Sequence, residues 1–125
     1  MITARDIMST TLHTVTVQTT IYDLANLLSS KRISGTPVLS DDGVVIGIVT
    51  EADLISKVGA TVGDIMTKSV SSVTEDTPMR EIAQLLSEKD IKRVPVMRGS
   101  KLVGMVSRGD IVRAMLRGDD QQDAH

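Results

Sequence analysis

A chain of 125 residues with 41% hydrophobic and 24% charged residues is long enough for one compact domain, or for two very small ones that share a core. The absence of cysteine excludes disulfides, thiolate metal ligands and cysteine nucleophiles. A formal net charge of −2 and a single aromatic residue, Tyr22, argue against a nucleic-acid partner, which needs basic and stacking side chains.

Both ends of the chain lack strong targeting or packing signals. The first residues have no apolar stretch of the signal-peptide kind, and no apolar run approaches the roughly 20 residues that cross a bilayer. We therefore expect a cytoplasmic protein with no membrane partner. Residues 119–125 are polar and predict a disordered tail.

The chain repeats itself once. The segment Asp6-Ile7-Met8-Ser9 returns as Asp64-Ile65-Met66-Thr67, and Pro37-Val38 returns as Pro95-Val96. Further along, Gly47-Ile48-Val49-Thr50 aligns with Gly104-Met105-Val106-Ser107. Two copies in register predict a pseudo-symmetric pair, with repeat 1 over residues 1–58 and repeat 2 over residues 59–118.

Each copy predicts the same elements in chain order. A short extended stretch (13–17; 71–74) precedes a helix with apolar residues at i, i+3, i+4 and i+7, for which Thr19 and Thr77 are candidate N-caps. Two strands joined by a hairpin turn follow (36–39 and 44–49; 94–97 and 102–106), and a second helix ends the copy (51–57; 108–117). The fold class is therefore α/β (α+β), with two βαββα repeats. One copy is too small to bury its apolar faces, so the two should pack together.

The strands and turns carry a motif of the form I-x-x-x-P-V, a turn, then G-h-h-[ST]-x-x-D-h, where h is apolar. It reads Ile33 to Val38 with Gly47 to Leu54, and again Ile91 to Val96 with Gly104 to Ile111. This pattern resembles the CBS domain, named after cystathionine β-synthase, over about residues 3–117.

The resemblance implies a Bateman-type module: two βαββα units packed sheet to sheet, with ligand clefts between the repeats. Similar modules bind AMP, ADP, ATP or S-adenosylmethionine as regulatory ligands, not as catalytic cofactors. They regulate an attached or partner protein and often form a homodimer. Adenine is implied to lie against residues 33–38 or 91–96.

The T-x-x-D part of the motif suits a nucleotide. Thr50 and Ser107 stand where a strand turns into a helix, and a hydroxyl there could donate to a phosphate beside free N–H groups. One turn further, Asp53 and Asp110 could accept from both hydroxyls of a ribose. The candidate ligand-binding residues are Thr16, Ile33, Gly35, Thr36, Pro37, Thr50 and Asp53 in repeat 1, and Thr74, Arg93, Val94, Pro95, Ser107, Arg108 and Asp110 in repeat 2.

The same spacing has a second interpretation. Ser/Thr-x-x-Asp at a helix start is close to a capping box, which needs no ligand.

The copies also differ, because Glu51 follows Thr50 whereas Arg108 follows Ser107. Since a guanidinium can clamp a phosphate, we expect unequal sites, with the second better suited to phosphorylated ligands.

No catalytic or metal constellation is present in the sequence. The two histidines, His13 and His125, have no ligand-spaced partners, and no Ser or Thr has a nearby histidine to activate it. We predict a regulatory ligand-binding module that is not an enzyme and that acts on a partner protein. The alternative is a ligand-free structural dimerisation or interaction module.

Overall fold

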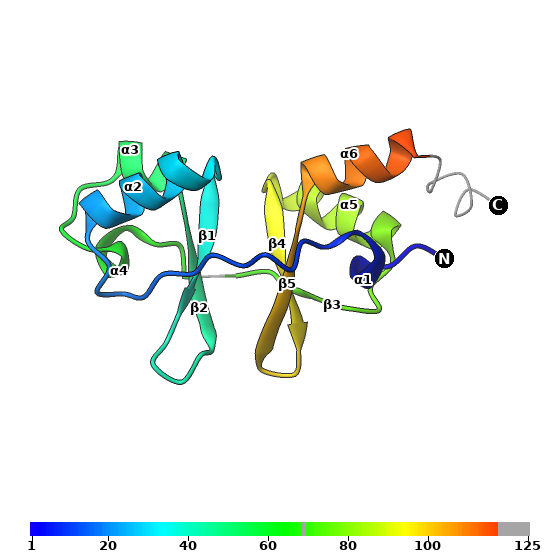
Figure 1. Cartoon of the computed structure of the whole chain (residues 1–125), viewed down its shortest axis with the longest axis horizontal. Coiled ribbons are helices and arrows are strands. Elements are labelled where there is room, and N and C mark those ends of the chain that lie inside the picture. Colours follow the sequence, from blue (N-terminus) through cyan, green and yellow to red (C-terminus); the bar gives the residue numbers. More distant parts are fainter. Residues whose placement is uncertain (69, 118–125) are drawn as a thin grey trace. The chain divides into compact units, whose positions relative to one another are not determined.

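The computed structural model describes residues 1–68 and 70–117, and the chain forms two compact units. Unit 1 is built from residues 1–12 and 71–125, and unit 2 from residues 13–70 (Figure 1). This division differs from the two sequence repeats, residues 1–58 and 59–118, because the opening segment of each repeat packs with the body of the other. The predicted tail, residues 119–125, lies outside the described residues.

Unit 2 contains a two-stranded sheet covered by helices. Its elements are α2 (Ile21–Lys31), β1 (Gly35–Leu39), β2 (Val45–Thr50), α3 (Glu51–Ser56) and α4 (Val62–Ile65). Strands β1 and β2 form an antiparallel hairpin, and a parallel bridge joins Val15 to Val38. The core consists of Val15, Leu24, Leu28, Val38, Val49, Val62 and Ile65.

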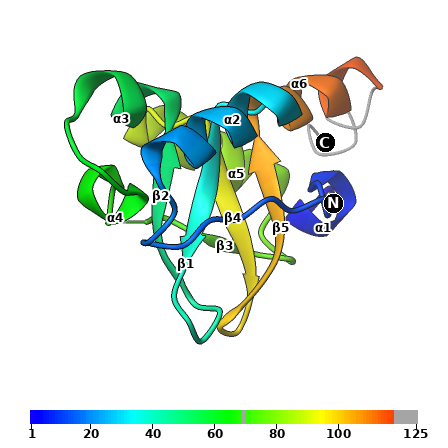
Figure 2. The ribbon, with the colours of Figure 1, turned by 60° about the vertical axis from the view of Figure 1, so that its left-hand side comes forward.

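Unit 1 contains a three-stranded sheet in the order β3-β4-β5. Its elements are α1 (Ala4–Ile7), β3 (Val73–Thr74), α5 (Met79–Lys89), β4 (Arg93–Arg98), β5 (Lys101–Ser107) and α6 (Arg108–Leu116). Strand β3 is parallel to β4, and β4 is antiparallel to β5. Figure 2 shows β4 and β5 as adjacent strands that share a hairpin turn, as β1 and β2 do.

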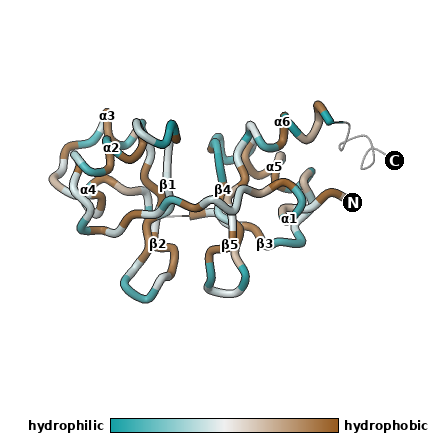
Figure 3. The backbone as a smooth tube through the Cα atoms, in the orientation of Figure 1, coloured by the Kyte–Doolittle hydropathy of each residue, from teal (hydrophilic) through white to brown (hydrophobic). Residues whose placement is uncertain are grey.

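The predicted α/β class is confirmed. The hydropathy of the chain changes along each hairpin. Hydrophobic residues run along the strands, whereas the tips of both hairpins are hydrophilic (Figure 3). The first predicted strand of repeat 1 is reduced to the Val15 bridge, while that of repeat 2 is β3.

The predicted N-caps are wrong by one residue. The Thr20 hydroxyl caps α2 by accepting from the Asp23 amide at 3.1 Å, and Pro78 precedes α5. Thr19 and Thr77 instead close the turns before these helices, where they accept from the amides of Thr16 and Thr74 at 3.1 and 3.0 Å.

The opening segments of the repeats form two short helices that were not predicted, α1 and α4. Each begins with a capping box, in which Asp6 pairs with Thr3 and Asp64 with Thr61. Figures 1 and 2 show α1 among elements from residues 73–116. The same Thr-x-x-Asp spacing that marks Thr50 and Asp53 was therefore the available signal for both helices.

Among residues 1–68 and 70–117, no helix has the length and apolar character needed to cross a membrane.

Candidate functional site

Both T-x-x-D motifs stand where a hairpin passes into a helix. Thr50 is the last residue of β2 and the N-cap of α3, and Ser107 is the last residue of β5 and the N-cap of α6. Thr50 pairs across the sheet with Gly35, and Ser107 with Arg93. Each unit therefore brings its own hydroxyl, carboxylate and first-strand residues together.

The backbone at these junctions is already engaged. The Glu51 amide donates to the Ser34 carbonyl at 2.9 Å, and the Arg108 amide donates to the Lys92 carbonyl at 2.9 Å. The amides of Asp53 and Asp110 donate to the hydroxyls of their N-caps. Fewer helix amides are free to bind an anion than the sequence suggested. Most hydrogen bonds to a ligand would therefore come from side chains.

In unit 2, Thr50 and Asp53 form a complete capping box. Asp53 Oδ2 accepts from the Thr50 amide at 3.0 Å and from the Thr50 hydroxyl at 3.2 Å. The Thr50 hydroxyl accepts in turn from the Asp53 amide at 3.2 Å. The second carboxylate oxygen, Oδ1, pairs with Lys57 Nζ at 2.8 Å.

In unit 1, Ser107 and Asp110 repeat this arrangement. Asp110 Oδ2 accepts from the Ser107 amide at 2.8 Å and from the Ser107 hydroxyl at 3.0 Å. Its Oδ1 pairs with Arg113 Nη2 at 2.6 Å. The capping interpretation is therefore realised in both motifs, and each Oδ1 also holds a cation.

The capping boxes of α1 and α4 can be compared with the Thr50–Asp53 and Ser107–Asp110 motifs. The hydrogen bonds of Asp6 and Asp64 to their caps are exposed, whereas the side chains of Asp53 and Asp110 are only 10% and 14% exposed. Backbone hydrogen bonds from Thr61 and Ala60 lower the pKa of Asp64 below its usual value. Asp53 and Asp110 thus differ from simple caps in being partly enclosed and paired with a cation.

The first-strand candidates are mostly buried. Gly35, Thr36 and Pro37 are buried in unit 2, as are Val94 and Pro95 in unit 1, while Ile33 and Arg93 are partly exposed. The Thr36 hydroxyl donates to the His13 carbonyl, which ties β1 to the segment before α2. Its hydroxyl therefore has a structural partner.

Thr16 and Thr74 occupy matching exposed turns. The Thr16 amide donates to the Thr19 hydroxyl, and the Thr74 amide donates to the Thr77 hydroxyl. Thr74 also pairs with Met97 of β4. Both threonines thus lie beside the first hairpin strand of their unit.

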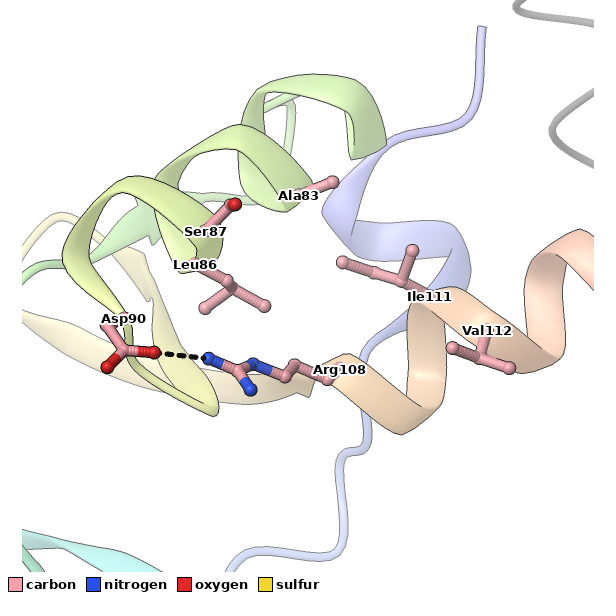
Figure 4. A pocket seen from close by; sticks show the side chains of 7 residues that line it. All are labelled: Ala83, Leu86, Ser87, Asp90, Arg108, Ile111 and Val112. Carbon is pink, nitrogen blue, oxygen red and sulfur yellow. Dashed lines mark hydrogen bonds and ion pairs between the residues drawn. The ribbon is translucent and has the colours of Figure 1, made fainter.

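Arg108, the first residue of α6, extends away from that helix toward the end of α5. Its Nε donates to the Ile91 carbonyl at 3.0 Å, and its Nη2 pairs with Asp90 Oδ1 at 3.3 Å. Figure 4 shows the guanidinium in a groove between α5 and α6, extending toward Asp90. A phosphate clamp by Arg108 would require it to leave these partners.

The glycine that stands three residues before Thr50 and before Ser107 has a packing role. A Cβ at Gly47 would lie 2.9 Å from Met66 Sδ, and one at Gly104 would lie 2.5 Å from Met8 Sδ. The space at each glycine is filled by a methionine from the opening segment of a repeat.

Comparison with known proteins identifies the family. The model of the CBS domain matches residues 4–60 and 62–117. The chain is 31% identical over 115 residues to the uncharacterized protein YlbB of Bacillus subtilis, covering 86% of this chain and 78% of YlbB. It is also 31% identical over 141 residues to the chloroplastic CBS domain-containing protein CBSX2 of Arabidopsis thaliana, covering 85% of this chain and 59% of CBSX2.

Two solved structures are similar over nearly the whole chain. The crystal structure of CBSX2 in complex with AMP has a TM-score of 0.87 at 33% identity and covers 94% of this chain and 98% of that structure. The CBS domain pair of protein MJ0100, in complex with 5′-methylthioadenosine and S-adenosyl-L-methionine, has a TM-score of 0.87 at 29% identity, with the same coverage. The chain belongs to the CBS-domain family, and its two matched segments form a CBS pair.

Proposed function

We propose that this CBS pair is a regulatory module that binds an adenosine ligand, of the AMP, ADP, ATP or S-adenosylmethionine class, and modulates a partner protein. The candidate contacts are the Thr50–Asp53 and Ser107–Asp110 pairs and the first-strand residues beside them. Complexes of two similar CBS pairs with AMP and with S-adenosyl-L-methionine support the ligand class. We propose no catalytic role, and the cytoplasmic location remains a prediction.

The observation that carries the proposal is the hydrogen-bonding capacity left on each carboxylate. A carboxylate has about four acceptor positions. Asp53 uses three of them: two on Oδ2 for the Thr50 amide and hydroxyl, and one on Oδ1 for Lys57. One position on Oδ1 remains for a ligand hydroxyl, and Asp110 has the same count.

A ribose cis-diol needs two acceptors, and the hydroxyl of the N-cap residue can release the second. If the Thr50 hydroxyl turns its proton toward a ligand phosphate, Oδ2 regains one acceptor position while both backbone bonds of the cap stay in place. Capping and ligand binding then no longer compete for the carboxylate. This mechanism favours ligands that offer an acceptor, such as a phosphate, near the hydroxyl.

The two sites are proposed to be unequal. Glu51 places a carboxylate next to Thr50, whereas Arg108 places a guanidinium next to Ser107. Arg108 can contribute to phosphate binding if it exchanges Asp90, a side chain that is 97% exposed, for the ligand. An exposed ion pair contributes little stability, so little is lost when Arg108 leaves Asp90. The charged hydrogen bonds to a doubly charged phosphate outweigh that loss.

Titration calorimetry of the nucleotide-free full chain tests the proposal with AMP, ADP, ATP, S-adenosylmethionine and 5′-methylthioadenosine. The informative variants are Asp53→Asn and Asp110→Asn, because asparagine keeps one oxygen for the cap but cannot accept from both ribose hydroxyls. We expect saturable binding in the parent and at least a tenfold loss of affinity in one of the two variants, as removal of a charged hydrogen-bond partner predicts.

Matched controls come from the two exposed capping boxes. Asp64→Asn in unit 2 and Asp6→Asn in unit 1 perturb a cap without touching a candidate site. Both should lower stability. Asp6→Asn should leave affinity unchanged, and Asp64→Asn should change it far less than Asp53→Asn does. Absence of heat from every ligand, with all four variants merely destabilised, would leave capping as the sole role of these motifs.

An exposed apolar face favours a second candidate function, self-association. A groove of about 420 Å³ runs between α5 and α6 and is lined by Ala83, Leu86, Ser87, Asp90, Arg108, Ile111 and Val112 (Figure 4). Val112 in this lining is 54% exposed, and Leu116, further along α6, is 82% exposed. We propose that this face supports a homodimer, and sedimentation velocity of the parent and of Leu116→Asp tests it: the parent should form dimers that the variant loses.

A further inference from the structure

Lys57 makes two contacts that join different parts of unit 2. It follows α3 as the C-cap residue, and its Nζ lies 2.8 Å from Asp53 Oδ1. The same ammonium donates to the Ile65 carbonyl at 3.1 Å. One side chain therefore bridges the candidate ligand carboxylate and the end of α4.

The segment around α4 is packed and hydrogen-bonded into unit 2, so a change at Asp53 can alter its stability. Val62 and Ile65 belong to the core of unit 2. The Met66 amide donates to the Val62 carbonyl at 2.9 Å, and the Thr67 amide donates to the Ile48 carbonyl of β2 at 2.8 Å. After this segment the chain passes into unit 1 at Ser71, which is one of the two covalent connections between the units.

The second repeat lacks this bridge. The position that corresponds to Lys57 is Ala114, which is fully buried. The cation on Asp110 is instead Arg113, which pairs with Oδ1 at 2.6 Å and, within the described part of the chain, makes no hydrogen bond to α1. The two carboxylates hold similar cations, but only that of Asp53 is tied to an opening segment.

We propose that Lys57 is a positioning residue that couples Asp53 to residues 61–67. A ligand hydroxyl that donates to Asp53 Oδ1 shares this oxygen with Lys57. The ion pair weakens as a result, and the hydrogen bond from Lys57 to the Ile65 carbonyl of α4 changes with it. Occupancy of the first-repeat site is thereby transmitted to the segment that leads into unit 1, whereas the second-repeat site has no such link. The ligand part of this inference rests on the proposed function.

Amide hydrogen exchange of the full chain without ligand tests the bridge itself. In Lys57→Met, exchange at the Met66 and Thr67 amides should accelerate about fivefold relative to the amides of β1, because a charged hydrogen bond from a partly exposed ammonium stabilises less than a buried one. Lys57→Arg, which keeps the charge and donors, should restore most of the protection. The matched control is Arg113→Met, which should leave exchange at Met8 and Ser9 unchanged.

Saturation with AMP, or with S-adenosylmethionine if calorimetry shows that it binds instead, tests the coupling. The ligand should change exchange at Met66 and Thr67 in the parent, and this change should disappear in Lys57→Met. A change of equal size in the variant, or unaltered exchange of the variant without ligand, overturns the inference even if the ligand binds. If nothing binds the parent, the proposed function and the coupling both fail, while the exchange of ligand-free Lys57→Met still decides whether the bridge exists.

Discussion

Glu75 is the buried carboxylate that distinguishes unit 1 from unit 2. Its Oε1 accepts from Arg98 Nε at 2.7 Å and its Oε2 from Arg98 Nη2 at 3.0 Å, while Arg5 Nε lies 3.4 Å from Oε2. Arg5 also pairs with Asp76 at 3.4 Å. The corresponding residue of repeat 1 is Val17, so this ionic contact between α1 and the sheet is confined to unit 1.

The Glu75 cluster should make the stability of unit 1 sensitive to acid. Hydrogen bonding by Arg98, and then the charges of Arg98 and Arg5, hold the pKa of Glu75 below its usual value. Because the folded pKa is lowered, the stabilisation is complete above the unfolded pKa of about 4.3 and is lost as the pH falls through the lower folded value.

Urea unfolding of the parent and of Glu75→Gln at pH 6 and pH 3 measures this effect. The variant should be less stable at pH 6. The difference should shrink at pH 3, which lies below the unfolded pKa, because the unfolded chain there binds a proton that the folded carboxylate resists. A difference that stays constant between the two pH values would show that Glu75 acts through packing alone.

At the scale of single residues, the sequence predicted which residues form the helix caps better than it predicted where the long side chains reach. The pairing of Thr50 with Asp53 and of Ser107 with Asp110 follows from spacing on a helix start, which is a local property. The reach of Lys57 to Ile65, and of Arg108 to Asp90, depends on rotamers selected by distant elements. The pairs Asp53–Lys57 and Asp110–Arg113 have the i,i+4 and i,i+3 spacing of helix neighbours, so spacing could have predicted them. It could not predict the contact of Lys57 with the Ile65 carbonyl.

At the scale of elements, the second hairpin strand of each unit is in close contact with an opening segment. The Ile48 amide of β2 donates to the Thr67 carbonyl, and the Met105 amide of β5 donates to the Ser9 carbonyl, at 2.9 and 3.0 Å. These bridges lie next to Gly47 and Gly104. A side chain at either glycine would push against the segment that covers it.

The two glycines differ in what they touch, which gives a graded prediction. A Cβ at Gly47 would lie 2.8 Å from the Thr67 backbone oxygen, whereas the three atoms nearest to a Cβ at Gly104 belong to the flexible Met8 side chain. We expect Gly47→Ala to destabilise by about 1–3 kcal/mol, as overpacking does, and Gly104→Ala to destabilise less.

Double variants separate the two causes in denaturant unfolding. Met8→Ala should relieve much of the effect of Gly104→Ala, because it removes the atoms in conflict. Met66→Ala should relieve little of the effect of Gly47→Ala, because the backbone oxygen stays. Equal rescue at both glycines would contradict the assignment of the backbone clash.

At the scale of the whole molecule, the internal repeat predicted the order of elements but not the chain segments that pack together. Periodicity and turn residues are local signals, and they placed the helices and strands within a few residues. The exchange of the opening segments involves contacts between residues far apart in sequence, such as those of Met8 with Gly104. No local pattern distinguishes packing within a repeat from packing with the other one.

The exchange predicts which half of the chain can fold alone. Residues 13–70 retain Val62 and Ile65, which are 0% and 1% exposed in the core of unit 2, whereas residues 1–58 lack them. Burial of two such side chains contributes about 3–6 kcal/mol, comparable to the whole stability of a domain of about 60 residues. The fragment 13–70 should therefore unfold cooperatively in urea and give dispersed amide NMR signals, and the fragment 1–58, although it is one complete sequence repeat, should give neither. A fragment 1–58 as stable as 13–70 would show that α4 is dispensable and that the repeat is the folding unit.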